Sequence, residues 1–257
     1  MTDKLLTRDL SPEFEFIELY PLNDVHLGDV LHKEKEFRAF LSFVLDKPYR
    51  YLMCIGDLVN NGIEGSATGA YGEKVRVGDQ PYEMVELLRP VADRILAMTG
   101  GNHEHRTKKA TDQDLTRLIA SLLGLQDYYK RDMINLKLTF GRKPNGKRQC
   151  YVIHAAHGGG GGVSAGGALN KAVAASDNTI ADLYIFGHVH KRIGTKHITF
   201  VPDTKNNLLL PVEKAIAVAS GWLGYGGYIA RAQLRPQVTG SAPITLWARE
   251  KRADVLI

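Results

Sequence analysis

The sequence predicts an α/β fold in which helices and mixed β-sheets pack as a sandwich. Three observations lead to this prediction: the order of apolar runs, a strand without polar alternation, and a strong hairpin signal in the second half. In the first half of the 257 residues, strand-like runs alternate with helical patterns, and the second half is richer in strands. That order is typical of mixed sheets rather than of a purely parallel sheet.

Seven apolar runs have the length of strands: Phe14–Tyr20, Tyr51–Ile55, Arg94–Met98, Met133–Phe140, Gln149–Ala155, Leu183–Phe186 and Ala215–Ala219. Tyr51–Ile55 lacks polar alternation, which indicates a strand covered on both faces. Met133–Phe140 alternates cleanly, as expected for a half-exposed antiparallel strand. Asn145-Gly146 is a tight-turn signal that predicts a hairpin between Met133–Phe140 and Gln149–Ala155.

Three segments between the strands have apolar residues at helical spacing: Lys33–Leu45, Pro81–Val91 and Asp112–Leu123. We find neither an internal repeat nor a linker long enough to divide the chain. We therefore expect one domain over residues 1–257, with the C-terminal strands and tail, 206–257, belonging to it.

The composition, 44% apolar and 24% charged, is that of an ordinary globular protein. No run approaches the roughly 18 apolar residues of a membrane-spanning helix, and the first ten residues lack the apolar core of a signal peptide. We therefore expect a cytoplasmic protein without membrane contact.

Cys54 and Cys150 lie in apolar runs, which predicts buried, reduced thiols. The net charge of +5 favours anionic partners without identifying them.

Five short polar blocks each come closely after an apolar run: Asp24-Val25-His26, Gly56-Asp57-Leu58-Val59-Asn60, Gly101-Asn102-His103-Glu104, His157-Gly158 and Gly187-His188-Val189-His190. Open α/β sheets place their ligands at the carboxyl ends of strands, so we expect the blocks to converge at one edge. Three residues, 21–23, separate the first block from its expected strand. Singly, Asp24 could cap a segment and Asn102 could adopt a turn conformation. Jointly, the Asp, Asn and His side chains indicate a site for divalent metal.

These blocks, in this order, resemble the calcineurin-like metallophosphoesterases over residues 24–190. The glycine run after His157 and the segment Ser220–Tyr228 further resemble a branch common in phage and prophage genomes, which would place the protein in the host cytoplasm. The resemblance implies a four-layer αββα sandwich with two mixed β-sheets. It also implies two divalent ions, with Mn²⁺ favoured over Fe, Zn, Co or Ni. Two metals roughly 3.5–4 Å apart can share a hydroxide that attacks phosphorus.

The resemblance also implies a role for each site residue. Asp24, His26 and His190 would hold the first metal, and Asn102, His157 and His188 the second. Asp57 would bridge the two ions, and His103 would stay unligated near the leaving group as the catalytic residue. Many relatives have aspartate where this chain has Asn60, to orient and charge the histidine. Asn60 keeps a hydrogen-bond acceptor but contributes no negative charge.

Several features have two readings. Arg106 and Lys108 could bind a substrate phosphate or belong to a solvated helix entrance, and the glycines at 158–162 could form a surface loop or approach a ligand. The aromatic residues of the Ser220–Tyr228 segment could line a pocket or pack. Basic residues around Asn145-Gly146 are typical of a soluble hairpin tip: Arg142, Lys143, Lys147 and Arg148.

The function predicted from these features is metal-dependent hydrolysis of a phosphate ester, with nucleic acid as one candidate partner. The basic charge and the phage-like resemblance slightly favour a phosphodiesterase or nuclease. The alternative is a phosphomonoesterase acting on a phosphoprotein or a nucleotide. A non-catalytic scaffold of the same fold is disfavoured, because no expected ligand is missing. The sequence leaves the oligomeric state open.

Overall fold

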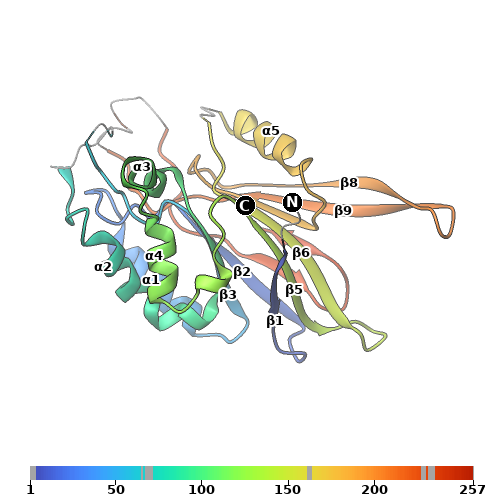
Figure 1. Ribbon diagram of the computed structural model, residues 1–257. Helices are drawn as coiled ribbons and strands as arrows, with labels where there is room; N and C mark the ends of the chain where they lie inside the picture. Colours follow the sequence, from blue (N-terminus) through green and yellow to red (C-terminus); the bar gives the residue numbers. More distant parts are fainter. Residues whose placement is uncertain are drawn as a thin grey trace.

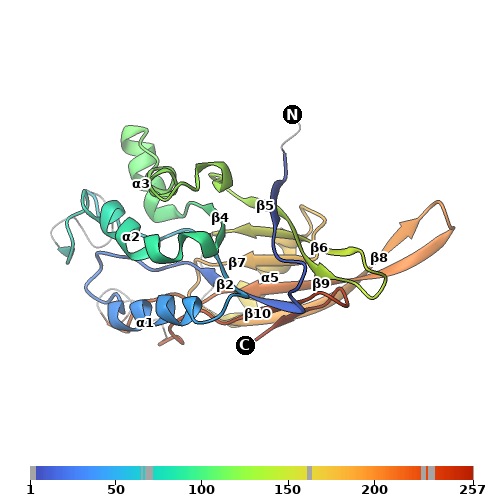
Figure 2. The ribbon, with the colours of Figure 1, turned by 90° about the horizontal axis from the view of Figure 1, so that it is seen from below.

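The computed structural model describes residues 4–64, 66, 72–160, 164–226, 230 and 235–256. Two mixed β-sheets pack face to face, and helices cover their outer faces (Figures 1 and 2). The helices are α1 (Glu34–Leu45), α2 (Gln80–Leu88), α3 (Asn102–Thr111), α4 (Leu115–Leu122) and α5 (Ala165–Ser176), with 3₁₀ turns at Arg89–Arg94 and Gln126–Tyr128. This arrangement confirms the αββα sandwich.

The first sheet has six strands in the order β1-β5-β6-β7-β9-β8. They are β1 (Leu6–Asp9), β5 (Ile134–Arg142), β6 (Arg148–Ala156), β7 (Leu183–Phe186), β8 (Ile193–Asp203) and β9 (Leu208–Val218). The pairs β5–β6 and β8–β9 are antiparallel, whereas the other neighbours in this sheet are parallel. The predicted hairpin is confirmed, since Phe140 pairs with Gln149 across the turn.

The second sheet has five strands in the order β11-β10-β2-β3-β4. They are β2 (Phe16–Leu22), β3 (Arg50–Ile55), β4 (Ile95–Thr99), β10 (Ile244–Trp247) and β11 (Ala253–Val255). The neighbours β2, β3 and β4 are parallel, and β10 joins β2 in antiparallel register. The carboxyl ends of the three parallel strands therefore meet at one edge, where the first three polar blocks begin.

Three apolar layers hold the sandwich together. The central layer lies between the sheets and includes Leu19, Met53, Leu136 and Ile153, all without solvent exposure. A second layer joins α1, α2 and α4 to the outer face of the five-stranded sheet, and a third packs α5 on the other sheet. Strand β3 contributes to both the central and the second layer. This burial on both faces explains why its sequence lacks polar alternation.

The sequence predictions missed several elements, of which the hairpin of β8 and β9 is the largest. Only Ala215–Ala219 was predicted there, but β9 begins at Leu208, and its partner β8 was not predicted. The distal half of this hairpin extends beyond the rest of the sheet (Figures 1 and 2). Its residues are half-buried or exposed, so burial leaves no apolar run there. Strands β1, β10 and β11 are only three or four residues long and give no clear pattern.

Two smaller predictions can also be compared with the structure. Cys54 is fully buried and free, as predicted, whereas Cys150 is free but only half-buried, because it lies on the less covered face of β6. Burial raises the pKa of the Cys54 thiol. Among the residues described, no helix is long and apolar enough to cross a membrane.

Candidate metal centre

The five polar blocks lie at the carboxyl ends of β2, β3, β4, β6 and β7, so strands of both sheets contribute. Strand β2 continues to Leu22, so only Asn23 precedes Asp24, and the three-residue separation expected for this block is wrong. Backbone hydrogen bonds join the blocks: the N–H of Val25 donates to the carbonyl of Asp57 at 2.8 Å. The N–H of Gly187 donates to the carbonyl of His157 at 3.0 Å.

The predicted ligands form two groups of converging side chains. In the first group, Asp24 Oδ1 lies 3.2 Å from His190 Nε2 and 3.7 Å from His26 Nε2. In the second, Asn102 Oδ1 lies 2.8 Å from His188 Nδ1 and 3.0 Å from His157 Nε2. All seven predicted ligand residues thus come together at one edge of the sandwich, although their positions in the sequence span 24 to 190.

Asp57 lies between the two groups. Its Oδ2 atom is 3.2 Å from His157 Nε2 in the second group and 4.0 Å from His26 Nε2 in the first. Asp57 is 2% exposed, so its carboxylate contacts these side chains rather than water. A carboxylate in this position can donate one electron pair to each of two ions, which is the geometry that a bridging ligand requires.

The residues present suit divalent metal. Asp24 Oδ1 is buried, and the nearby histidine nitrogens do not have the geometry of a hydrogen bond to it, which is costly for a carboxylate oxygen unless a cation binds it. His157 Nδ1 lies 2.8 Å from the carbonyl of Ile55, so this nitrogen donates, and in the neutral ring it is Nε2 that has the lone pair, on the side of Asn102 and Asp57. That tautomer is the one in which an imidazole can ligate through Nε2.

Backbone conformation at the site is unusual. Five of the predicted ligands have left-handed φ values between 49° and 70°: Asp24, His26, Asp57, His188 and His190. Residues other than glycine rarely adopt this region, at a cost of order 1–3 kcal/mol each, and such residues concentrate at functional sites. The surrounding hydrogen bonds and packing therefore hold these loops in conformations that direct side chains inward.

The acidic and basic groups of the site shift one another's pKa values. Burial alone would raise the pKa of Asp24 and of Asp57, but the adjacent histidines outweigh it and hold both pKa values low. Burial would lower the pKa of His157, but Asp57 and Asp24 raise it to about 10. The same carboxylates raise the pKa of His26.

Metal binding is expected to release protons. Without metal, His157 has a pKa of about 10 and carries a proton at neutral pH, and the pKa of His26 is also raised, but an imidazole must be neutral to ligate. Apparent metal affinity should therefore increase as pH rises from 6 toward the raised pKa values. Titration calorimetry of metal-stripped protein with Mn²⁺, in buffers of different ionisation enthalpy at pH 7, should give a release of at least one proton. Binding heats that are independent of the buffer would contradict this expectation.

His103 lies beside the ligand groups, 3.8 Å from Asp57 Oδ2, and joins His26 and Asp57 in a third cluster. Its Nδ1 lies 2.5 Å from the carbonyl of Asn60, and Arg106 Nη2 lies 2.9 Å from its Nε2. Since a guanidinium can only donate, Nε2 accepts and Nδ1 donates. Burial and the nearby His26 lower the pKa of His103 to about 3, so this ring is neutral at neutral pH.

Asn60 does not act as the sequence suggested. Its side-chain amide donates to Glu73 Oε1 at 2.7 Å, so it is the backbone carbonyl of Asn60 that accepts from His103. Glu73 also accepts from Gln80 Nε2 at 2.9 Å. A carboxylate therefore lies next to Asn60 after all, supplied by a residue 13 positions later. Nothing in the sequence pattern around Glu73 indicates this contact.

Glu104 has a structural role that the sequence analysis did not assign. It is 3% exposed, and its two carboxylate oxygens accept four backbone N–H groups. Oε2 accepts from Asp57 at 3.0 Å and Gly101 at 2.9 Å, and Oε1 accepts from Leu58 at 2.6 Å and Val59 at 3.2 Å. Glu104 thereby joins the block after β3 to the block after β4. Its place at the third position of α3 was the available signal, because a glutamate there often bonds back to the start of the helix.

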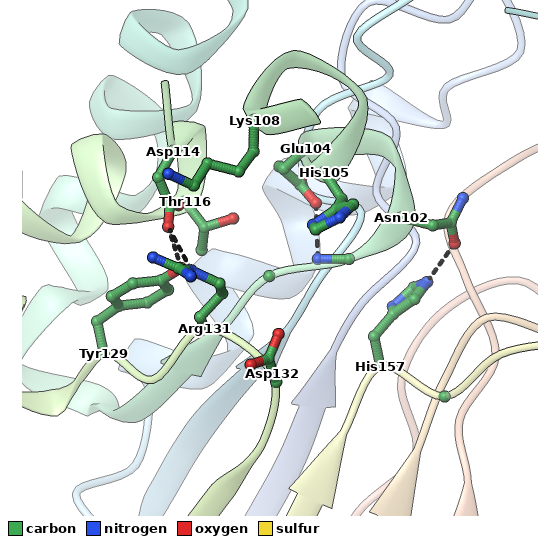
Figure 3. Close-up of a pocket in the computed structure, with 13 residues that line it drawn as sticks. Asn102, Glu104, His105, Lys108, Asp114, Thr116, Tyr129, Arg131, Asp132 and His157 are labelled. Carbon is green, nitrogen blue, oxygen red and sulfur yellow. Dashed lines mark hydrogen bonds and ion pairs between the residues drawn. The ribbon is translucent and has the colours of Figure 1, made fainter. Parts of the chain in front are cut away.

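The two basic candidates lie in different surroundings. Arg106 faces the site through His103, whereas Lys108 forms an ion pair with Asp112 near the end of α3 and lines an adjacent pocket (Figure 3).

In the glycine run, Gly158 and Gly160 have positive φ values, and Gly161 and Gly162 lie outside the described residues. Trp222 is buried and packs on Phe37 and Phe40, which favours the packing interpretation. Tyr225 is exposed, and Tyr228 lies outside the described residues.

Several solved structures are similar to this chain. A Vps29 single mutant from Entamoeba histolytica is similar at 13% identity and a TM-score of 0.41, covering 91% of this chain and 87% of its own. Vacuolar Protein Sorting 29 from Cryptosporidium parvum is similar at 11% identity and a TM-score of 0.40, covering 95% of this chain and 97% of its own. Nuclease MPE from Pseudomonas putida is similar at 17% identity and a TM-score of 0.35, covering 91% of this chain and 85% of its own. No curated protein sequence matches.

The profile of the calcineurin-like phosphoesterases matches residues 22–192, a range that contains all five polar blocks. The matched range covers more than half of the chain. The chain therefore belongs to the calcineurin-like phosphoesterase family.

Proposed function

We propose that this protein is a dinuclear metal-dependent phosphoesterase that cleaves phosphodiesters. The observation that carries the proposal is the position of Asp57, whose Oδ2 atom lies within 4.0 Å of His26 and 3.2 Å of His157, one from each ligand group. A single buried carboxylate between two such groups is the arrangement expected for a bridging ligand. The basic net charge of +5 supports an anionic polymer over a neutral substrate.

The ligand assignment follows the two groups. Asp24, His26 and His190 would hold one ion, Asn102, His157 and His188 would hold the other, and Asp57 would be shared. Two divalent ions held by these residues would supply an activated water for attack on phosphorus and positive charge beside the phosphate oxygens. Nitrogen and oxygen donors of this kind accept Mn²⁺, Fe, Zn, Co or Ni, and Mn²⁺ is the ion we favour.

Arg106 and His103 act on the substrate rather than on the metals. The Arg106 guanidinium, half-buried beside His103, would donate to a non-bridging phosphate oxygen, for which its fork geometry is suited. The carbonyl of Asn60 holds His103 by Nδ1, which keeps Nε2 on the side of Asp57. This would place His103 next to the leaving group, where we assign it the role of catalytic residue. Lys108, paired with Asp112, lies too far along α3 for the same contact, and we assign it to the pocket wall.

The decisive experiment compares hydrolysis of bis(p-nitrophenyl) phosphate with that of p-nitrophenyl phosphate. Metal-stripped protein is reloaded with Mn²⁺, and Asp57→Asn serves as the blank. We expect diester cleavage that falls at least 10³-fold in the variant, because an amide cannot bridge two cations as a carboxylate does. A preference for the monoester would instead favour the phosphomonoesterase alternative. Absence of both activities with two bound metals would contradict the proposal and favour a scaffold.

His103→Ala is expected to slow diester hydrolysis roughly 10²–10⁴-fold, the range for groups that act in general acid–base catalysis. Metal content should remain at two ions per chain, because both ligand groups are complete without His103. Metal analysis and steady-state kinetics measure the two quantities together. His197→Ala, on the outlying strand β8, is the matched control and should change neither. Loss of metal in His103→Ala would show that His103 ligates with His26 and Asp57.

A further inference from the structure

A pocket with a volume of about 220 Å³ lies next to the candidate metal centre. Asn102 and His157, which belong to one ligand group, also line this pocket, so the two sites are continuous (Figure 3). We propose that the pocket binds the nucleoside part of a nucleotide substrate, an inference that rests on the proposed phosphoesterase function. Pockets for drug-sized ligands usually have about 300–1,000 Å³, so this one admits a single small group rather than a peptide segment or a duplex.

The charges of the lining argue against a second phosphate. Two cationic side chains, Lys108 and Arg131, stand against three carboxylates, Glu104, Asp114 and Asp132. Both cations are also near acids: Lys108 pairs with Asp112, and Arg131 Nε lies 3.6 Å from Asp114 Oδ2. Without an excess of positive charge, the pocket offers little to an additional anion. It is better suited to a neutral group that both donates and accepts hydrogen bonds.

Thr116 provides an independent sign of a ligand. Its side chain is fully buried, it lines the pocket, and its Oγ1 atom has no hydrogen-bond partner. Buried hydroxyl groups without a partner are uncommon and indicate a missing one. Gly100 faces this atom, since a Cβ at Gly100 would lie 3.3 Å from Thr116 Oγ1. Gly100, which also lines the pocket, therefore places no side chain against this hydroxyl.

The ring of Tyr129 favours a nucleoside over a sugar alone. Its hydroxyl donates to Asp114 Oδ2 at 2.7 Å, which fixes the ring in the pocket wall. A held aromatic ring is a stacking surface for a nucleobase and is sequence-tolerant, because every base has a π-face. His105 and Asp132, both exposed at the pocket wall, add a donor and an acceptor for the polar edges of the ligand.

The test is titration calorimetry of Mn²⁺-loaded protein with adenosine 5′-monophosphate, ribose 5-phosphate and inorganic phosphate. We expect adenosine monophosphate to bind at least 10-fold more tightly than the other two. Thr116→Val removes one hydroxyl at nearly constant volume. It should weaken the binding of adenosine monophosphate about 10-fold more than the binding of inorganic phosphate. Asp132→Asn, at an exposed position that tolerates substitution, is a second variant. It should also weaken the binding of adenosine monophosphate more than that of inorganic phosphate. Thr245→Val on β10, far from the pocket, is the control.

Equal affinities for the three ligands, or a Thr116→Val variant that leaves adenosine monophosphate binding unchanged, would overturn the proposal. Ribose 5-phosphate binding as tightly as adenosine monophosphate would also overturn it, because the base would then make no contact. These outcomes are separate from a failure of the proposed function. That failure would be the absence of hydrolysis of both nitrophenyl substrates, neither of which carries a nucleoside.

Discussion

Glu104→Ala is expected to destabilise the protein by about 2–4 kcal/mol and to reduce bound metal below two ions per chain. The substitution leaves four buried N–H groups, those of Asp57, Leu58, Val59 and Gly101, without their acceptor. An unsatisfied buried donor costs about 1–3 kcal/mol. Removing a buried carboxylate near Asp57 offsets part of that loss, because burial and Asp57 raise the pKa of Glu104.

The Glu104→Gln variant separates hydrogen bonding from volume. One oxygen of the glutamine can still accept two N–H groups, but its NH₂ group would face the other two donors. We therefore expect an intermediate loss of stability together with reduced metal content. Urea unfolding and metal analysis measure both effects. Glu36→Ala on α1, where the side chain is 57% exposed, is the control and should change stability by less than about 0.5 kcal/mol. Wild-type metal content in Glu104→Ala would show that this residue does not position Asp57.

Gly101→Ala is expected to lower diester hydrolysis at least 10³-fold. A Cβ at Gly101 would overlap Asp57 Oδ1 and the Asp57 backbone nitrogen, and would lie 2.9 Å from Asp57 Cγ. The carboxylate would have to rotate or shift, which also breaks the hydrogen bond from the His103 N–H to Asp57 Oδ1 at 2.8 Å. A displaced Asp57 can no longer lie between both ligand groups, so we expect about one ion per chain.

Gly78→Ala is the matched control for this substitution, because a Cβ at Gly78 meets nothing within 4 Å. The variant should retain wild-type turnover and metal content. Metal analysis, steady-state kinetics and thermal unfolding of both variants distinguish a local effect from unfolding. A Gly101→Ala protein with normal turnover would contradict the assignment of Asp57 as the shared ligand, since the added methyl group must move that carboxylate.

The sequence alone determined the central strands and the order of the site residues. Buried strands such as β3 and the hairpin of β5 and β6 are apparent because burial and tight turns restrict which residues are allowed. The metal-binding side chains were apparent because ligand chemistry restricts them to a few residue types, and each follows a strand end. The structure brings all seven predicted ligands together at one edge of the sandwich.

Tertiary structure decided the contacts that join segments distant in the sequence. Glu73 next to Asn60, the Asn60 carbonyl against His103, and the unpartnered hydroxyl of Thr116 each depend on how loops fold over the sheet edge. The hairpin of β8 and β9 was also apparent only in the tertiary structure. Its distal residues are half-buried or exposed, so burial imposes no clear apolar pattern on the sequence there that would predict strands. Sequence patterns record local periodicity and residue chemistry. Distances between loops follow only from the packing of the two sheets.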